Sequence, residues 1–350
     1  MNEIFTLKWK KNTLVLLDQT KIPREVAYVE CKTVQDIYDA IQTMIVRGAP
    51  AIGVSAAYGM VIAANTYDGK SSSDKEKFMD YLRECAEYLK SSRPTAVNLM
   101  WAVDRIMDKV EEMQIASIEA IKAEMEKDAI AIHKEDENTN RTIGLNLLSL
   151  LKDGDTVLTH CNAGSLAASA YGTALAVFYI AQEKGMNIKA YADETRPRLQ
   201  GANLTAFELA EHGVDVTLIC DNMAAVVMSQ GKIDAVIVGC DRVAANGDTA
   251  NKIGTYSVSL LADHFQIPVY IAAPTTTIDM DCPDGSTIPI EERSADEVLC
   301  VNGGYIAPKE VKTYNPAFDV TPAEYITAIV TEKGIVYPPF KENLEKIMRK

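Results

Sequence analysis

The sequence predicts an α/β protein of two domains, a smaller and mainly helical N-terminal domain followed by a domain built on a parallel sheet. Two observations carry this prediction. The chain has 350 residues, whereas a single domain usually has about 100–200. The pattern of apolar residues also changes near residue 150, from helical periodicity to short apolar strands that alternate with helical stretches. We therefore expect domains at residues 1–145 and 146–350.

The predicted N-terminal domain contains long helices and a few short strands. Across residues 74–90, and again across 118–132, apolar residues recur with the spacing of one helical face. Residues 14–17 and 26–29 form short, strand-like segments. The polar tract 69–73 has no periodicity, so we expect a loop between two helices there.

The second domain alternates strands with helices, which predicts a parallel sheet covered on both faces. Ligands of such sheets bind beyond the carboxyl ends of the strands. Unusual polar residues follow four of the strands, so we expect the functional site at this edge. The predicted strands are 156–159, 188–192, 214–220, 235–239 and 268–273, and the polar segments are 160–165, 193–197, 221–222 and 240–242.

Charge and composition exclude several classes of partner. The 35 basic and 49 acidic residues give a formal net charge of -14, which repels nucleic acid and anionic membrane surfaces alike. No run of about 18 apolar residues occurs, and no apolar stretch follows the basic residues near the N-terminus, so we expect a cytoplasmic protein. An anionic small ligand requires a local cluster of Arg, Lys and backbone N–H groups.

Cysteine and glycine patterns argue against common cofactor sites. The seven cysteines are an odd number and include no CxxC pair, so we expect neither a disulfide framework nor a zinc site. Neither G-x-G-x-x-G nor G-x-x-x-x-G-K-[ST] occurs, so the sheet carries no dinucleotide fingerprint and no nucleoside-triphosphate loop. The sequence predicts a site without metal or cofactor.

Cys161 and Asp241 are the candidates for proton transfer. Cys161 follows an apolar strand and precedes small residues typical of a helix N-terminus, whose positive end favours a thiolate. Asp241 stands at the mouth of the sheet with apolar residues behind it, and removal from water would let it keep a proton and donate it. The alternatives are a buried structural cysteine, and an aspartate that caps a helix or pairs with Arg242.

Candidate binding residues lie in four further segments. Asn251 and Lys252 precede an apolar helix whose free N–H groups would suit a phosphate or sugar hydroxyls. Arg47 offers charge, and the small residues after it allow close backbone approach. Arg93 and Gln200 add donors. Each segment alone could be a turn, but together they supply what an acidic protein needs to hold one phosphate.

Five motifs resemble methylthioribose-1-phosphate isomerase of the methionine salvage pathway, from an aldose-ketose isomerase family related to regulatory subunits of the initiation factor that exchanges guanine nucleotide. The motifs are RGAPAIG at 47–53, SRPTAVNL at 92–99, CNAGS at 161–165, ETRPRLQG at 194–201 and DRVAANGDTANKIGTY at 241–256. The resemblance implies a Rossmann-like C-terminal domain, a helical N-terminal domain and a homodimer. It implies a catalytic pair, Cys161 and Asp241, and the substrate-binding residues Arg47, Gly48, Ala49, Arg93, Gln200, Asn251 and Lys252.

Two residues depart from the family pattern. Cys240 stands where we expect alanine in many relatives, and His160 where some relatives have an apolar residue. Strand alternation points His160 and Cys161 to opposite faces, so we do not expect a direct couple between them. Both departures bear on substrate preference more than on the reaction class.

The resemblance implies conversion of S-methyl-5-thioribose 1-phosphate into the corresponding ribulose 1-phosphate. The alternative is the same isomerisation of 5-deoxyribose 1-phosphate or another pentose 1-phosphate, because one apolar group changes binding by only ~1–3 kcal/mol. A non-catalytic regulatory subunit would have no use for Cys161 or Asp241. A NAD-dependent oxidoreductase would need the glycine fingerprint that the sequence lacks.

Overall fold

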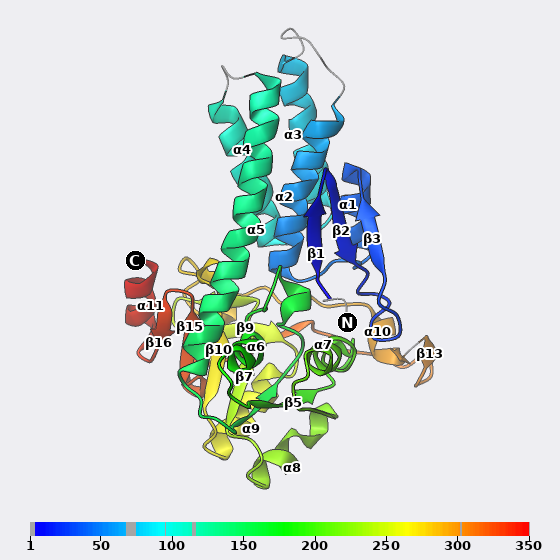
Figure 1. Cartoon of the computed structure of the whole chain (residues 1–350). Helices are drawn as coiled ribbons and strands as arrows, with labels where there is room; N and C mark the ends of the chain where they lie inside the picture. Colours follow the sequence, from blue (N-terminus) through cyan, green and yellow to red (C-terminus); the bar gives the residue numbers. More distant parts are fainter. Residues whose placement is uncertain (1–3, 68–74, 95, 114–116, 302, 350) are drawn as a thin grey trace. The chain divides into compact units, whose positions relative to one another are not determined.

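The structure, a computed structural model, describes residues 4–67, 75–94, 96–113, 117–301 and 303–349 (Figure 1). It is a mixed α/β protein with a parallel sheet and a helical N-terminal region, as predicted. Two compact units can be distinguished. The first unit comprises Met1–Asn138 and Ser165–Gly172, and the second unit comprises Thr139–Gly164 and Thr173–Lys350. Among the described residues, no helix combines the length and apolar character that crossing a membrane requires.

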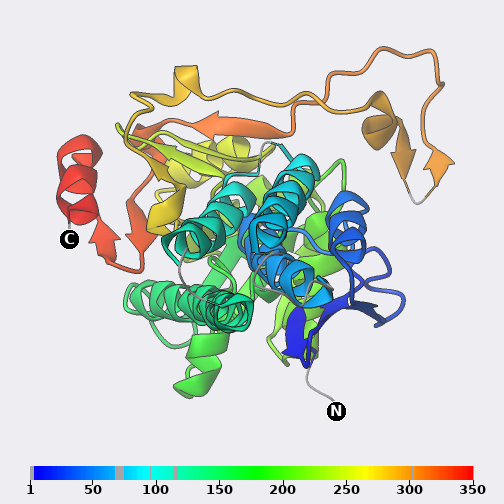
Figure 2. The ribbon, with the colours of Figure 1, turned by 90° about the horizontal axis from the view of Figure 1, so that it is seen from above.

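The first unit packs helices around a buried apolar helix, and Figure 2 looks along several of them. Helix α2 is buried over most of its length and contacts α1, α3 and α4, because a helix that is apolar on all sides must be covered on all sides. The helical periodicities are confirmed, whereas the predicted loop at 69–73 lies outside the described residues. The elements are β1 (Leu7–Lys10), β2 (Thr13–Leu17), β3 (Tyr28–Cys31), α1 (Val34–Gln42), α2 (Ala49–Thr66), α3 (Lys75–Ser91), α4 (Val97–Glu112) and α5 (Ile118–Leu148), which continues into the second unit.

The second unit contains a seven-stranded sheet of order β16-β15-β10-β7-β4-β5-β6. All its neighbouring strands pair in parallel except β15 and β16. The predicted strands are confirmed to within one or two residues at each end. The strands are β4 (Thr156–Thr159), β5 (Lys189–Asp193), β6 (Val216–Ile219), β7 (Ala235–Val238), β10 (Val269–Ala272), β15 (Ala328–Thr331) and β16 (Gly334–Val336), and the helices are α6 (Ala176–Glu183), α7 (Ala206–Glu211), α8 (Ala224–Ser229), α9 (Thr255–His264) and α11 (Phe340–Met348).

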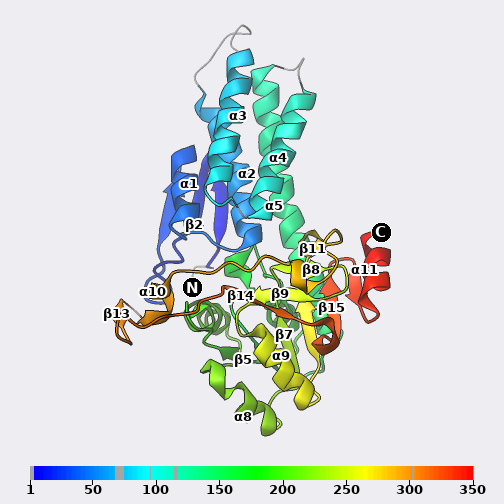
Figure 3. The same cartoon turned by 180° about the vertical axis from the view of Figure 1, so that it is seen from behind.

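The polar stretch before α9 contributes β8 and β9 to a smaller sheet of order β11-β8-β9-β14 (Figure 3). The polar residues of β9 are buried, and β8 and β14 pair with the two edges of this strand. A long connection between β11 and β14 contains α10 and the two-stranded sheet β12-β13 (Figure 2). The elements are β8 (Arg242–Ala244), β9 (Thr249–Lys252), β11 (Ile278–Asp279), α10 (Ala295–Leu299), β12 (Cys300–Val301), β13 (Gly304–Tyr305) and β14 (Phe318–Thr321).

The order of the parallel strands defines where a ligand can bind. From β4 the chain proceeds outward to β5 and β6, then returns to the other side of β4 and proceeds through β7, β10 and β15. In open α/β sheets the ligand crevice lies at the carboxyl ends of the strands where this direction reverses. The reversal falls between β4 and β7, the two strands that Cys161 and Asp241 follow.

Candidate active site

Cys161 lies two residues beyond the end of β4, and two threonine hydroxyls hold its backbone. Its φ angle of 65° is in the left-handed region, which residues other than glycine rarely adopt. The Cys161 N–H donates to Thr195 Oγ1 at 2.8 Å, and Thr205 Oγ1 donates to the Cys161 carbonyl oxygen at 2.6 Å. The half-buried thiol therefore stands on a turn that is fixed on both sides.

The prediction of a helix N-terminus beside the thiol is wrong. The chain forms no α-helix from Cys161 to the start of α6 at Ala176, a stretch that is described throughout. The N–H groups of Thr173 and Leu175 instead donate to the carbonyl oxygen of Ala163 at 3.0 and 3.2 Å. The small residues after the thiol thus lie in a loop that is closed by these hydrogen bonds. No helix N-terminus stabilises a Cys161 thiolate, so another positive group is needed for this.

Asp241 lies three residues beyond β7. Its N–H donates to the Ala250 carbonyl oxygen at 2.9 Å and the chain enters β8 directly, so Asp241 is not a helix N-cap. The Arg242 guanidinium binds the carboxylate of Asp279 at 3.1 Å. The Asp241 side chain is exposed, so the predicted shielding by apolar residues is wrong in this chain, because the apolar residues of β7 end at Val238.

Asn251 and Lys252 are buried at the end of β9. The Asn251 side-chain amide donates to Thr255 Oγ1 at 2.9 Å. The Lys252 ammonium donates to the Ala317 carbonyl oxygen at 3.0 Å and lies 4.8 Å from the centre of the Phe318 ring. A buried strand therefore presents both residues, and α9 begins shortly after them at Thr255, as predicted.

Lys252 connects the two candidate catalytic residues. Burial is the main cause that lowers the pKa of Lys252, and the charges of Arg293 and Arg198 lower it further, whereas Cys161 and Asp241 raise it. Cys161, Asp241, Arg198 and Arg293 are therefore all close enough to the Lys252 ammonium for their charges to change its pKa.

Gln200 immediately precedes a π-helical turn, Gly201–Thr205. Such turns are rare and occur frequently at functional sites. The Gln200 Oε1 atom is buried and accepts no hydrogen bond from the residues that the structure describes. A Cβ at Gly201 would lie 1.7 Å from the Asp193 carbonyl oxygen, so only glycine permits this close approach of two backbones.

Arg47, Gly48, Ala49 and Arg93 belong to the first unit, whereas the other predicted site residues belong to the second. Gly48 precedes α2 with a φ of 88°, and a Cβ there would lie 2.3 Å from the Ala167 carbonyl oxygen. No side chain caps the N-terminus of α2, where Ala49 begins an 18-residue helix. Its free N–H groups suit an anion. Arg93 is half-buried in the connection between α3 and α4.

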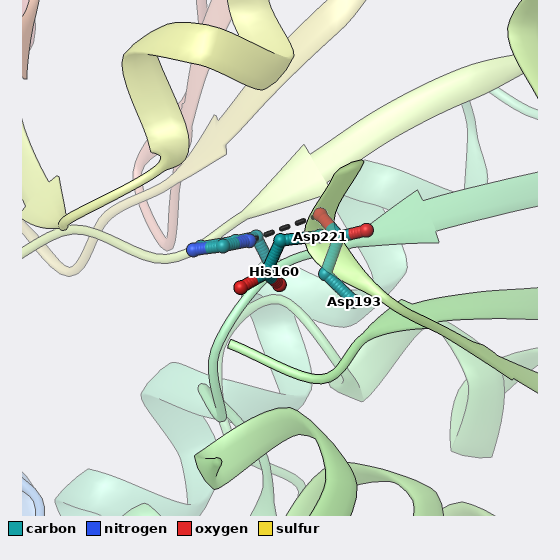
Figure 4. A group of neighbouring side chains, drawn as sticks. All are labelled: His160, Asp193 and Asp221. Carbon is teal, nitrogen blue, oxygen red and sulfur yellow. Dashed lines mark hydrogen bonds and ion pairs between the residues drawn. The ribbon is translucent and has the colours of Figure 1, made fainter. Parts of the chain in front are cut away.

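His160 forms a buried ion pair at the ends of β4 and β5 (Figure 4). Its Nδ1 lies 3.0 Å from Asp193 Oδ2, and its Nε2 lies 2.8 Å from the Ile253 carbonyl oxygen. Both nitrogens face acceptors, which favours the imidazolium. Burial alone would lower the pKa of His160, but the hydrogen bond and charge of Asp193 outweigh it and raise this pKa. The ring is engaged by Asp193 and Ile253, which fits a structural role better than that of a base.

His160, Asp193 and Asp221 also line a pocket of about 320 Å³, and their ligand atoms lie within 4.8 Å of one another. Asp221 accepts hydrogen bonds from the backbone N–H groups of Thr195 and Arg196, both at 2.7 Å. A metal ion would have to replace these bonds and those of His160. The group is therefore explained as a hydrogen-bond network rather than a metal site.

We expect His160→Gln to destabilise the protein more at low pH than at high pH. Below the ordinary pKa of about 6.5, histidine is charged in both the folded and the unfolded chain, so the ion pair contributes fully. This contribution is lost as pH rises through the raised folded pKa. Loss of one partner of a buried pair should cost about 3 kcal/mol at pH 6 and less at pH 9. Urea unfolding at both values would measure this, with the exposed His264→Gln as control; a cost independent of pH would contradict a charged His160.

Cys240, next to Asp241, is a weak candidate for chemistry. Its sulfur lies 3.3 Å from Thr277 Oγ1. Burial raises the pKa of the Cys240 thiol to about 12, so it remains protonated at neutral pH. Cys161 is thus the better candidate of the two thiols.

Four residues of this region were missed by sequence reasoning. Thr195 and Arg198 lie inside the quoted motif at 194–201, but a motif does not say which of its side chains face the thiol. Thr205 follows that motif by four residues. Arg293 has no local signal, because its position depends on pairing with a distant segment: its N–H donates to the Asn315 carbonyl oxygen at 2.9 Å.

Comparisons with known proteins identify relatives over the whole chain. A protein from Clostridium botulinum (strain Okra / Type B1), named 5-deoxyribose 1-phosphate isomerase, is 59% identical over 352 residues and covers all of both chains. A protein of the same name from Bacillus thuringiensis serovar kurstaki is 57% identical over 347 residues, which is 99% of each chain.

Solved structures share the fold. The 5-methylthioribose 1-phosphate isomerase from Pyrococcus horikoshii OT3 has a TM-score of 0.96 and 45% identity, covering 99% of this chain and 96% of that one. The delta subunit of translation initiation factor eIF-2B from A. fulgidus has a TM-score of 0.92 and 42% identity, covering 99% and 100%. The model of the initiation factor 2 subunit family matches residues 45–338. The chain therefore belongs to the initiation factor 2 subunit family.

Proposed function

We propose that the protein is an aldose-ketose isomerase that converts 5-deoxyribose 1-phosphate into 5-deoxyribulose 1-phosphate. The observation that carries this proposal is the full-length identity of 59% to a relative named for that activity. The motifs alone pointed first to methylthioribose 1-phosphate. The comparisons favour the substrate that the sequence left as the alternative.

The site offers the groups that this isomerisation needs. A phosphate on carbon 1 masks the aldehyde, so the ring must open while a hydrogen moves from carbon 2 to carbon 1. In one route the Cys161 thiolate removes the carbon 2 proton, a carbon 1–carbon 2 double bond forms, and the bond from carbon 1 to the ring oxygen breaks. Asp241 protonates that oxygen. Cys161 then returns its proton to carbon 1 as the carbon 2 hydroxyl loses its own to Asp241.

A second route uses the same two residues. Asp241 protonates the ring oxygen, the ring opens, and hydride moves directly from carbon 2 to carbon 1. The carbon 2 hydroxyl then loses its proton to the Cys161 thiolate. In both routes Asp241 is the acid that protonates the ring oxygen. General acid-base catalysis of this kind contributes about 10²–10⁴ in rate.

Lys252 has two roles in this proposal. Its buried ammonium interacts favourably with the Cys161 thiolate, which no helix N-terminus stabilises, and with the Asp241 carboxylate that remains once Asp241 has given its proton to the ring oxygen. With Arg198 and Arg293 it forms a local cluster of three cations, in which both guanidinium groups also pair with Glu297, at 3.0 and 4.0 Å. Such a cluster suits the substrate phosphate. The buried Oε1 of Gln200 can accept a hydrogen bond from a sugar hydroxyl. Arg47, Gly48, Ala49, Arg93 and Asn251 stay predicted binding residues.

The second candidate substrate is S-methyl-5-thioribose 1-phosphate. It is supported by the structure from Pyrococcus horikoshii, which is named for that substrate and is 45% identical. The two sugars differ at carbon 5, where one bears a methylthio group and the other a hydrogen. An apolar difference of this size changes binding by only about 1–3 kcal/mol, so one protein can use both substrates.

Turnover of the two substrates tests the proposal. Purified protein without added metal or nucleotide is incubated with each sugar phosphate, and ketose formation is followed by NMR. We expect turnover of both, with the higher kcat/KM for 5-deoxyribose 1-phosphate. A higher kcat/KM for the methylthio substrate would establish the second candidate. Folded protein that converts neither would contradict the isomerase function and favour a regulatory subunit without catalytic activity.

A further inference from the structure

We propose that Thr195 and Thr205 are positioning residues that together fix the Cys161 backbone and thereby aim its thiol at the reacting carbons. The inference rests on the proposed isomerase function. The two hydroxyls bind the two peptide groups on either side of the Cys161 Cα, since one accepts from its N–H and the other donates to its carbonyl oxygen. Such a pair restrains both backbone angles of one residue.

Thr195 is itself held in one orientation. Its hydroxyl donates to the Asp193 carbonyl oxygen at 3.1 Å, which leaves an oxygen lone pair for the Cys161 N–H. Its backbone N–H donates to Asp221 Oδ1 at 2.7 Å. The Thr195 side chain is fully buried, so water does not compete for these bonds. Thr195 can therefore act as a fixed acceptor for Cys161.

The Thr205 hydroxyl is also held in one orientation, but as a donor to Cys161 where Thr195 is an acceptor. Its hydroxyl accepts from the Asn162 side-chain amide at 3.0 Å, so its own proton points to the Cys161 carbonyl oxygen at 2.6 Å. Asn162 is oriented in turn by the buried carboxylate of Glu208, which also accepts from the Tyr179 hydroxyl. Thr205 is fully buried and ends the π-helical turn that follows Gln200.

The left-handed conformation of Cys161 explains why two bonds are needed. A residue with a Cβ prefers the strand or helical region, and a left-handed conformation persists only where its surroundings enforce it. Without either hydroxyl, Cys161 is free to relax, and relaxation rotates its Cα–Cβ bond. A misplacement of about 1 Å can cost about 100-fold in rate. The predicted loss is therefore in kcat rather than in substrate binding.

Paired substitutions test this inference. Thr205→Val and Thr195→Val remove the hydroxyl and keep the shape, whereas Thr205→Ser and Thr195→Ser keep the hydroxyl. We expect each valine variant to lower kcat by about 10- to 100-fold with KM within about threefold. The serine variants should retain kcat within about threefold. The control is Thr321→Val, because the buried Thr321 hydroxyl forms no hydrogen bond with the described residues and its loss should leave kcat unchanged.

Alkylation of Cys161 supplies a readout that needs no substrate. The rate with iodoacetamide, followed by mass spectrometry of the Cys161 peptide across pH 6–9, should change several-fold in the valine variants only. Valine variants with wild-type kcat and alkylation would overturn the inference, and so would serine variants as impaired as valine ones. If Thr205→Val does not fold, the Thr195 pair decides. If the wild type converts no sugar phosphate, the proposed function fails, while alkylation still tests the positioning role.

Discussion

Replacing Cys161 by serine is expected to lower kcat by about 100- to 10,000-fold without unfolding the protein. A serine hydroxyl has nearly the shape of the thiol but does not ionise near neutral pH, so it cannot serve as the base. The hydrogen bonds from Thr195 and to Thr205 involve only the backbone of residue 161, so the turn should survive the substitution. Measurement of kcat by NMR, with thermal unfolding followed by circular dichroism, separates chemistry from stability.

Cys220→Ser is the matched control for this experiment. Cys220 is also half-buried and also follows a strand of the parallel sheet, but on the outer strand β6 instead of the central β4. Nearby Glu194 raises the pKa of the Cys220 thiol, which keeps it protonated. We expect kcat within about twofold of wild type. Equal losses in both variants, or no loss in Cys161→Ser, would contradict the assignment of Cys161.

Asp241→Asn is expected to lower kcat to a similar extent, by about 100- to 10,000-fold. The amide has the size of the carboxylic acid but no acidic proton for the ring oxygen, and both proposed routes need that proton to open the ring. Because Asp241 is exposed and its backbone N–H bonds to Ala250, the substitution should leave the fold unchanged. The control is Asp263→Asn, an exposed carboxylate on α9. An active Asp241→Asn variant would exclude this residue as the acid.

Deuterium oxide distinguishes the two routes with the wild-type protein. Removal of the carbon 2 proton by Cys161 allows exchange, so the ketose should carry deuterium at carbon 1. A direct hydride shift carries the original hydrogen and leaves carbon 1 unlabelled. An unlabelled product, together with a smaller loss in Cys161→Ser than in Asp241→Asn, would favour the hydride route.

The main sheet was predictable because its central strands β4, β7 and β10 are buried on both faces. Strands of this kind read as continuous apolar runs, and β4 and β7 therefore appeared at the correct places in the sequence. The rule that ligands bind beyond the carboxyl ends of parallel strands then placed Cys161 and Asp241 at this edge of the sheet. This part of the site required no knowledge of long-range contacts.

The remaining features depend on pairing that no local pattern reveals. Thr249–Lys252 is largely polar in sequence yet forms the buried strand β9, whose backbone pairs with the distant β14 as well as with β8. The small residues after Cys161 suggested a helix start, but a left-handed turn stands there because two distant threonines bind its backbone. The exposure of Asp241 likewise follows from how far beyond β7 it lies.

The π-helical turn Gly201–Thr205 determines the relative directions of the Gln200 and Thr205 side chains. The Ala206 N–H binds the Gly201 carbonyl oxygen, a span of five residues where an ordinary helix spans four. Residues five apart therefore share a face here, whereas in an α-helix they would point about 140° apart. Winding the same five residues as a regular α-helix would rotate Thr205 away from the Gln200 face. The π-helical winding of this turn, and not only the identity of its residues, thus determines which side chains share a face.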